Sequence, residues 1–213
     1  MTHPDDEVKV VEKYVLIFDF CSSTAILETL IEDGREVRWR NLLIEVKKFL
    51  WAEQARLQFD LYKFTGDGWI LFFDKPTESQ ELFLFMKRLC DMYLARYKRD
   101  IAPIVPKRFN TGITFGLTDG RMVRFRMNEQ IEYIGRPLNL AARLQGAIGG
   151  RNNDPPQNKV LMTKGVYHDL RSDISDSYRI AKVQRTLKNV AGGESLEYIK
   201  LSLYEPAKAK AQT

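Results

Sequence analysis

The chain has 213 residues, which suits one large domain or two small ones, and 44% of them are hydrophobic, enough for a buried core. Its 33 Lys and Arg outnumber its 28 Asp and Glu, and the resulting charge of +5 and pI near 9.1 favour anionic partners such as nucleotides, although a slightly basic surface would also explain them. Two cysteines and two histidines argue against a disulfide-stapled secreted framework, a zinc site and Ser-His-Asp chemistry.

The composition of the first residues bears on where we expect the protein to lie in the cell. Residues 1–13 are too acidic and too poor in apolar residues for a signal peptide, and no apolar run is long enough to span a bilayer. We therefore expect a cytoplasmic protein without membrane contact. In this interpretation residues 1–13 are an N-terminal extension, residues 14–204 form one domain, and the tail over 205–213 is disordered.

Apolar periodicity and turn residues predict one α/β (α+β) domain with a mixed sheet, in the order β-α-α-β-β-α-β-β-α-β followed by a short helix and two strands. In the first half of the chain we expect a strand over 14–20, a helix capped by Ser22, Ser23 or Thr24, an interruption at 33–35, and a helix over 36–55. Two strands around 66–68, a helix over 77–97 and a hairpin over 109–125 follow. The last elements are a strand at 131–135, a helix over 136–148, a strand at 159–163, a helix near 165–170 and two final strands.

Two carboxylates stand out against this pattern. Asp19 interrupts the apolar run "VLIFDF", where an ionised carboxylate is costly unless a cation meets it. Asp67 lies in the "GDG" turn between two strands, although Asp-Gly is also a favoured turn pair, so alone it indicates only a turn. If the two strands are neighbours, the acids face each other and divalent cations would relieve their repulsion. Ser22 and Ser23 lie at a helix N-terminus, where backbone N–H groups suit phosphates.

Three blocks, "FDFCSST", "YKFTGDGWILFF" and "YIGRPLNLAARLQ", together resemble the signature motifs of class III nucleotidyl cyclases, in register from about residue 14 to residue 170. The resemblance implies the class III cyclase fold, a ferredoxin-like mixed sheet flanked by helices. It also implies conversion of a nucleoside triphosphate into a 3′,5′-cyclic monophosphate and pyrophosphate. By the same resemblance, Asp19 and Asp67 match the two metal-binding aspartates, which would hold two Mg²⁺ or Mn²⁺ ions.

The third block and the late strands extend the resemblance to the ribose and the phosphates. Asn139 matches the residue that positions the ribose, and Arg143, one helical turn later, matches the one that meets the transition-state charge. Lys188, in "RTLKNV", resembles the family's phosphate-binding lysine, and an exposed lysine on a strand is an equal alternative. Family members form their sites across a dimer interface. Because this chain carries both sets of residues, we expect a homodimer with two equivalent sites.

The base is less clearly indicated. Lys63 and Glu132 match the base-selecting pair of adenylate cyclases, and a lysine at the first position disfavours GTP. Their hydrogen bonds suit adenine, cytosine and uracil. Aromatic side chains beside the base would narrow the pocket and favour a single-ring base. Phe64 and Tyr133 are the candidates. We expect Phe64 to pack in the core, whereas Tyr133 either packs there or lines the base site. The short chain resembles the standalone bacterial pyrimidine cyclases of Pycsar antiphage systems, whose cyclic UMP or CMP triggers a separate effector protein.

Three other interpretations stay open. One is an adenylate cyclase that makes cyclic AMP. A second is a palm-type enzyme such as a diguanylate cyclase or polymerase, which the lack of a "GGDEF"-like hairpin disfavours. The third is an inactive nucleotide- or RNA-binding module, which the retained acids and Arg143 disfavour. Basic residues of the helix over 77–97 lack interleaved aromatics, so we expect a solvated face there and no nucleic-acid partner.

Overall fold

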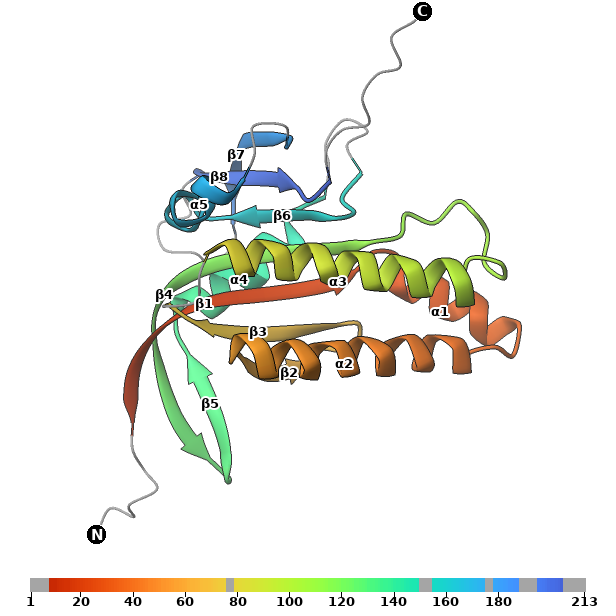
Figure 1. Cartoon of the computed structure of the whole chain (residues 1–213), viewed down its shortest axis with the longest axis horizontal. Helices are drawn as coiled ribbons and strands as arrows, with labels where there is room; N and C mark the ends of the chain where they lie inside the picture. Colours follow the sequence, from red (N-terminus) through yellow and green to blue (C-terminus); the bar gives the residue numbers. More distant parts are fainter. Residues whose placement is uncertain (1–7, 76–78, 150–154, 175–177, 188–194, 205–213) are drawn as a thin grey trace, which may run out of the picture.

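The computed structural model describes residues 8–75, 79–149, 155–174, 178–187 and 195–204 (Figure 1). An eight-stranded sheet forms its centre, with the strand order β2-β3-β1-β4-β6-β8-β7 and with β5 paired to β4. β4 and β6 pair in parallel and the other described pairings are antiparallel, so the sheet is mixed as predicted. The strands are β1 (Lys9–Phe20), β2 (Asp60–Phe64), β3 (Gly68–Asp74), β4 (Ile113–Met127), β5 (Gln130–Ile134), β6 (Lys159–Met162), β7 (Ile180–Thr186) and β8 (Ser195–Ser202).

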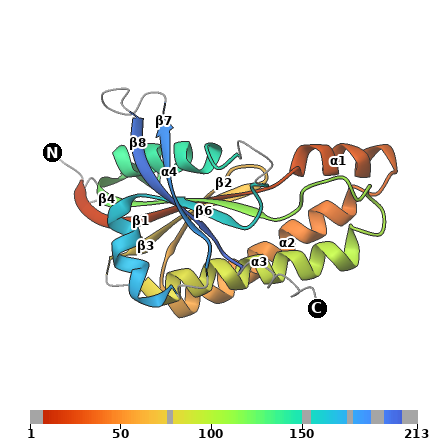
Figure 2. The same ribbon diagram turned by 90° about the horizontal axis from the view of Figure 1, so that it is seen from above.

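Helices cover both faces of the sheet. The helices are α1 (Ser23–Glu32), α2 (Val37–Leu57), α3 (Ser79–Asp100), α4 (Arg136–Gly146) and α5 (Lys164–Leu170), the last followed by a 3₁₀ turn (Arg171–Asp173). α2 and α3 run side by side on one face, and α4 lies on the other, as Figure 2 shows. Among the described residues, none of the helices combines the length and the apolar character that crossing a bilayer requires.

The side chains of β1 alternate between two cores. Leu16 and Phe18 belong to the large core beneath α2 and α3, whereas Val15 and Ile17 belong to a smaller cluster beneath α4. Successive strand residues point to opposite faces, so Asp19 shares the α4 side with Val15 and Ile17. Asp19 is also the penultimate residue of the strand. Asp19 therefore lies at the end of the strand, on the face of the sheet that α4 covers.

The hairpin predicted over 109–125 is wrong, because β4 runs unbroken through the Asp119–Gly120 turn signal. Along its length β4 pairs with β1, and Lys13 lies opposite Gly120. That long ladder outweighs a local turn preference. The chain turns later, at Asn128 and Glu129, whose φ angles of 49° and 64° fit a tight two-residue hairpin into β5. The same ladder carries β1 back to Lys9, five residues before the predicted start of the strand.

α4 lies unusually close to the strand beneath it. A Cβ atom at Gly116 of β4 would come within 2.1 Å of the carbonyl oxygen of Ala141 and 2.6 Å of the backbone nitrogen of Gln145. Only glycine leaves room for this approach. Gly116 therefore sets the position of α4, the helix that carries Asn139 and Arg143.

Candidate active site

The side chains of Asp19 and Asp67 meet at the ends of two neighbouring strands. Asp19 lies opposite Gly68 in the β1–β3 ladder, and the Phe20 N–H donates to the carbonyl oxygen of Asp67 at 3.2 Å. A Cβ at Gly68 would lie 1.9 Å from the carbonyl oxygen of Phe18, so the close approach of the strands requires glycine there. The two strands thus bring both carboxylates to one point.

The acid pair is electrostatically strained. Burial, followed by the hydrogen bond and the charge of Asp67, raises the pKa of Asp19 to about 8. The Ser23 hydroxyl donates to Asp67, and the Thr114 hydroxyl donates to the Asp19 carbonyl oxygen at 3.3 Å. Oxygen donors of this kind suit Mg²⁺ or Mn²⁺. Within the described ranges no group of three or more His, Cys, Asp or Glu side chains gathers.

A cavity of about 590 Å³ opens beside the acid pair and the start of α1. Ser22, Ser23 and Thr24 line it together with Asp19 and Asp67. Ser22 occupies the position before the helix with a left-handed φ of 57°, and its side chain makes no capping hydrogen bond. Because the Ser23 hydroxyl turns to Asp67 instead, no side chain of the predicted capping residues is seen to cap α1, and the first N–H groups of the helix are left for an anion.

Sequence reasoning missed several lining residues of this cavity, among them Gln145 and Asn110. Gln145 reaches it from α4, and its side-chain amide donates to the Thr114 hydroxyl at 2.8 Å. Asn110 lines it from the segment before β4. Whether these two residues line the cavity depends on how the elements pack together, and neither position carries a sequence motif that indicates it.

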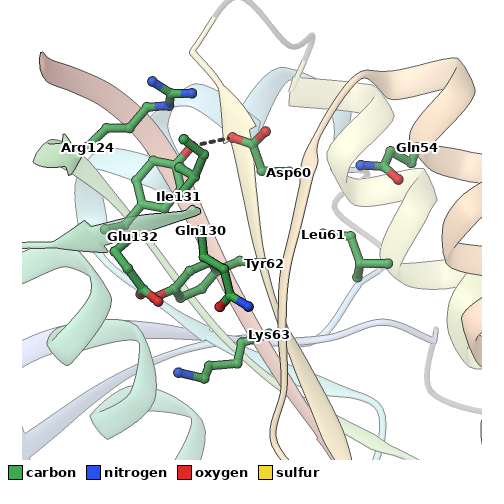
Figure 3. Close-up of a pocket in the computed structure, with 10 residues that line it drawn as sticks. Gln54, Asp60, Leu61, Tyr62, Lys63, Arg124, Gln130, Ile131 and Glu132 are labelled. Atoms are coloured by element: carbon green, nitrogen blue, oxygen red, sulfur yellow. Dashed lines mark hydrogen bonds between the residues drawn. The ribbon is translucent and has the colours of Figure 1, made fainter. Parts of the chain in front are cut away.

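A second cavity, of about 470 Å³, holds the predicted base-reading residues (Figure 3). Lys63 enters from β2, and Glu132 and Tyr133 enter from β5. The Tyr62 hydroxyl donates a hydrogen bond to the Glu132 carboxylate. This bond occupies one of the two carboxylate oxygens that we expect to accept hydrogen bonds from the base. Burial and this contact raise the pKa of Tyr62 to about 12, so the phenol stays protonated.

Tyr62 was not predicted as a site residue. The ladder between β2 and β3 shifts register between Leu61 and Lys63, with Tyr62 at the irregularity. A bulge of this kind lets two consecutive residues line one cavity, whereas a regular strand would turn them to opposite faces. The sequence carries no sign of the bulge, so its alternation pattern conceals Tyr62.

Phe64 and Tyr133, the two aromatic residues considered in the sequence analysis, differ in their burial. Phe64 is 49% exposed, so the expectation that it packs in the core is wrong, although its ring lies 4.7 Å from that of Trp69. Tyr133 is buried, as expected for a residue packed in the core, and its role in reading a base stays a prediction. Its ring packs on Phe72, it lines the second cavity, and its hydroxyl donates to Asp60 at 2.8 Å.

The predicted pair on α4 lies apart from both cavities. Asn139 and Arg143 are exposed on α4, four residues apart on one face of the helix, and line neither cavity. Lys188 lies outside the described residues. The two cavities share no lining residue. Within one chain, therefore, the acid pair, the base-reading pair and the α4 pair occupy three separate places.

Comparisons with solved proteins match this architecture. The adenylyl cyclase CyaB from P. aeruginosa superposes with a TM-score of 0.70 at 17% identity, covering 95% of this chain and 98% of that chain. The guanylate cyclase domain of RhGC from Catenaria anguillulae, in complex with GTP, gives 0.61 at 13% identity over 91% and 98% of the two chains. Adenylate cyclases from Trypanosoma brucei in their monomeric state give 0.61 at 14% over 89% and 87%.

This chain has the class III nucleotidyl cyclase fold. No protein-family model matches the sequence, and a search of curated proteins also finds no match. The class III cyclase fold predicted from the three sequence blocks is thus confirmed from the arrangement of strands and helices. The reaction and the base rest on the site residues themselves.

Proposed function

We propose that the protein is a metal-dependent nucleotidyl cyclase, which converts a nucleoside triphosphate into a 3′,5′-cyclic nucleotide and pyrophosphate. The observation that carries the proposal is the meeting of Asp19 and Asp67 in a cavity beside the open N-terminus of α1. A triphosphate would lie there with its charge facing backbone N–H groups and the small side chains of Ser22 and Ser23.

Each residue has a chemical role in this reaction. The ribose 3′-hydroxyl gives up its proton to water and its oxygen bonds to the α-phosphorus. The bond from that phosphorus to the oxygen it shares with the β-phosphate breaks, and pyrophosphate leaves with the electron pair. Asp19 and Asp67 would hold two Mg²⁺ or Mn²⁺ ions, which when bound stabilise the attacking and leaving oxygens. Asn139 would orient the ribose. Arg143 would donate to the nonbridging oxygens, where charge builds in the transition state. Lys188 would bind the phosphates.

The separation of the residues argues for a homodimer. The face of α4 with Asn139 and Arg143 is exposed and lies apart from the acid pair of its own chain. In a two-fold dimer each chain would present its base-reading pair and its α4 face to the partner's acid pair, which gives two equivalent sites.

The preferred substrate is a pyrimidine nucleotide, UTP or CTP, giving cyclic UMP or cyclic CMP. Aromatic rings of Tyr62 and Tyr133 crowd the base cavity, and one acceptor of Glu132 is already taken by Tyr62. A single-ring base needs less room than a purine and can still use the Lys63 ammonium. The product would act in antiphage defence through a separate effector protein, by the resemblance to standalone pyrimidine cyclases.

Product analysis tests this function. Purified protein with Mn²⁺ and one of UTP, CTP, ATP or GTP is assayed for cyclic nucleotides by chromatography, with an Asp67→Asn variant as the control. A cyclic pyrimidine as the main product supports the proposal. Cyclic AMP as the main product would instead establish an adenylate cyclase, the alternative in which Lys63 and Glu132 read adenine. Tight nucleotide binding without any product would favour the inactive binding module.

A further inference from the structure

An exposed apolar row runs along α2, outside the proposed site. Val37, Ile44 and Trp51 are 46%, 44% and 54% exposed, although the core face of the same helix is buried. They are seven residues apart, and a spacing of seven brings side chains back to nearly the same side of a helix. Single exposed apolar residues are common, but three in line over about 21 Å of helix form a continuous ridge.

A groove of about 380 Å³ lies beside this row, between α2 and α3. Ile44 and Asn41 line it from α2, so the groove and the apolar row share a wall. Its charged lining residues are Arg38, Lys48, Arg96 and Arg99 against Glu45 and Asp100, an excess of two positive charges. The α2–α3 groove, as we call it, shares no lining residue with either cavity of the proposed site.

The carboxylates in the groove do not cancel its positive field. The Arg99 side chain, which hydrogen-bonds Asp100, holds the pKa of that carboxyl below its usual range, and the charges of Arg96 and Arg38 act in the same direction. Arg96 also pairs with Glu45 at 2.7 Å. Lys48 pairs with the same Glu45 at 3.0 Å, so within the described residues Arg38 is the groove cation without an ion pair, and it can meet an incoming carboxylate directly.

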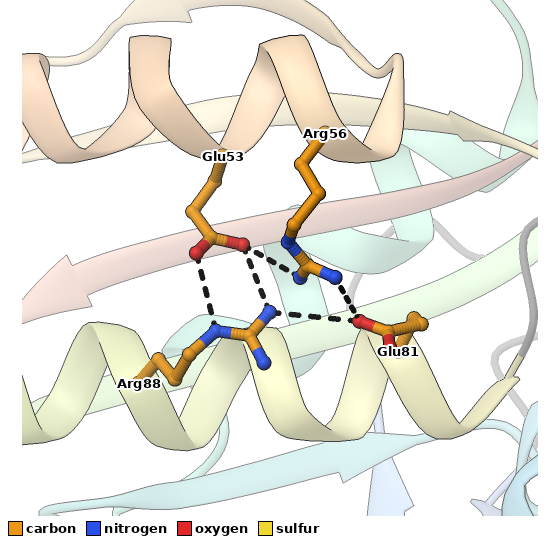
Figure 4. Close-up of polar contacts among 4 residues, drawn as sticks. All are labelled: Glu53, Arg56, Glu81 and Arg88. Atoms are coloured by element: carbon orange, nitrogen blue, oxygen red, sulfur yellow. Dashed lines mark hydrogen bonds and ion pairs between the residues drawn. The ribbon is translucent and has the colours of Figure 1, made fainter.

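The walls of the groove are held at a fixed spacing. Glu53 of α2 accepts two hydrogen bonds from Arg88 of α3, at 3.1 and 2.8 Å, and Arg56 bridges Glu53 to Glu81 (Figure 4). This network ties the other ends of the same two helices. The groove is thus preformed, which lowers the entropy lost when a partner binds.

We propose that the α2–α3 groove and the adjoining apolar row form a docking surface for an acidic amphipathic helix of a partner protein. Apolar side chains of that helix would pack along Val37, Ile44 and Trp51, and its carboxylates would pair with Arg38 and be attracted by the groove's excess of two positive charges. Such a partner would bind without covering either cavity of the proposed site, which suits a regulatory role.

Two other occupants fit less well. A second copy of this chain meeting the surface through a two-fold axis would bring the same surplus of positive charge against itself. An anionic lipid surface is flat and would face Glu45 and Asp100 as well as the arginines, whereas a helix can enter the groove and leave those acids paired. Charge and shape together therefore favour the acidic helix.

Selection of helical peptides tests the docking surface. A phage-displayed library of helical peptides is selected against the full chain, and the enriched peptides are synthesised. We expect acidic sequences with apolar residues at helical spacing. Binding should shift the emission of Trp51 to the blue, because Trp39 and Trp69 are 4% and 3% exposed and contribute little change.

Variants separate this groove from nonspecific attraction. Ile44→Asp and Arg38→Glu should each weaken peptide binding at least tenfold, whereas Lys98→Glu, an exposed position on α3 outside the groove, should change it less than twofold. Circular dichroism checks that each variant is folded. Failure to enrich acidic helices, or equal binding to the groove variants, would overturn the proposal. A change of oligomeric state in Ile44→Asp on sedimentation would assign the surface to a second copy. Cosedimentation with phosphatidylserine vesicles that Ile44→Asp abolishes would assign it to lipid.

Discussion

At the scale of single residues, Asp19 shows how strand geometry reconciles an acid with an apolar run. Val15 and Ile17 fill the smaller core, and the same alternation then places Asp19 beyond the end of that core, at the edge of a cavity. Gly68 lets β3 approach β1 closely, which places Asp67 next to Asp19. Burial raises the pKa of Asp19 most, and the hydrogen bond and the charge of Asp67 raise it further; a bound cation would offset the charge repulsion.

Replacing Asp67 with asparagine tests this pair directly. The change removes one metal ligand and the repulsion together, so cyclase turnover should fall by at least about 100-fold. At pH 8 the metal-free variant should melt at a higher temperature than the metal-free wild type, because like charges no longer face each other. Added Mn²⁺ should raise the melting temperature of the wild type only. Equal stabilisation of both proteins by Mn²⁺ would contradict a metal site at this pair.

Tyr62 offers a second test, on the base cavity. Tyr62→Ala removes an aromatic ring and frees the Glu132 carboxylate, so the cavity should accept a purine more readily. We expect the ratio of ATP to UTP or CTP turnover to rise by about tenfold. Phe64→Ala is a matched control, because Phe64 is also an aromatic residue of β2 but lies outside the cavity. If both variants shift the ratio alike, the cavity does not select the base.

At the scale of elements, the contact between α4 and β4 is set by a single glycine. The helix carries Asn139 and Arg143 on its exposed side, so its height above the sheet decides how far these side chains reach. Ala141 and Leu144 are fully buried on its other side. A helix fixed at its buried face in this way would present its exposed face rigidly to a partner chain in the proposed dimer.

Gly116→Ala should disturb this contact. The added methyl group would overlap the Ala141 carbonyl and force α4 outward, which should cost about 1–3 kcal/mol of unfolding free energy and lower turnover. Gly146→Ala is the control, since a methyl group there meets nothing within 4 Å, and it should leave stability equal or raise it by up to about 1 kcal/mol. Denaturant unfolding measures both. Equal stability of the two variants would mean that α4 is not held tightly at Gly116.

At the scale of the whole molecule, the separate places of the three residue groups predict complementation. Asp67→Asn and Arg143→Ala should each be nearly inactive as pure proteins. When the two variants are mixed and exchange subunits, about half of the dimers should be heterodimers, and each heterodimer has one intact site of its two. Activity should therefore recover to about a quarter of the wild-type value. Activity is measured after refolding the two chains together. Absence of recovery, with heterodimers present, would place a complete site within one chain.

The order of elements was predictable from the sequence because apolar periodicity and turn residues act locally. The long helices and the mixed sheet were predicted from these signals, whereas the class III cyclase fold was implied by the resemblance of the three sequence blocks. Asp19 was identifiable as a functional candidate from chemistry alone, since a carboxylate in an apolar run demands a reason. These features depend on a residue and its near neighbours.

Only the tertiary structure decided the features that depend on distant partners. The ladder with β1 overrode the turn signal at Asp119–Gly120, and the bulge in β2 turned Tyr62 toward Glu132. Phe64 was left exposed by the same strand, against expectation. Pairing and packing energies add up over many residues and exceed any single local preference, so the walls of the base cavity became visible only once the strands were placed side by side.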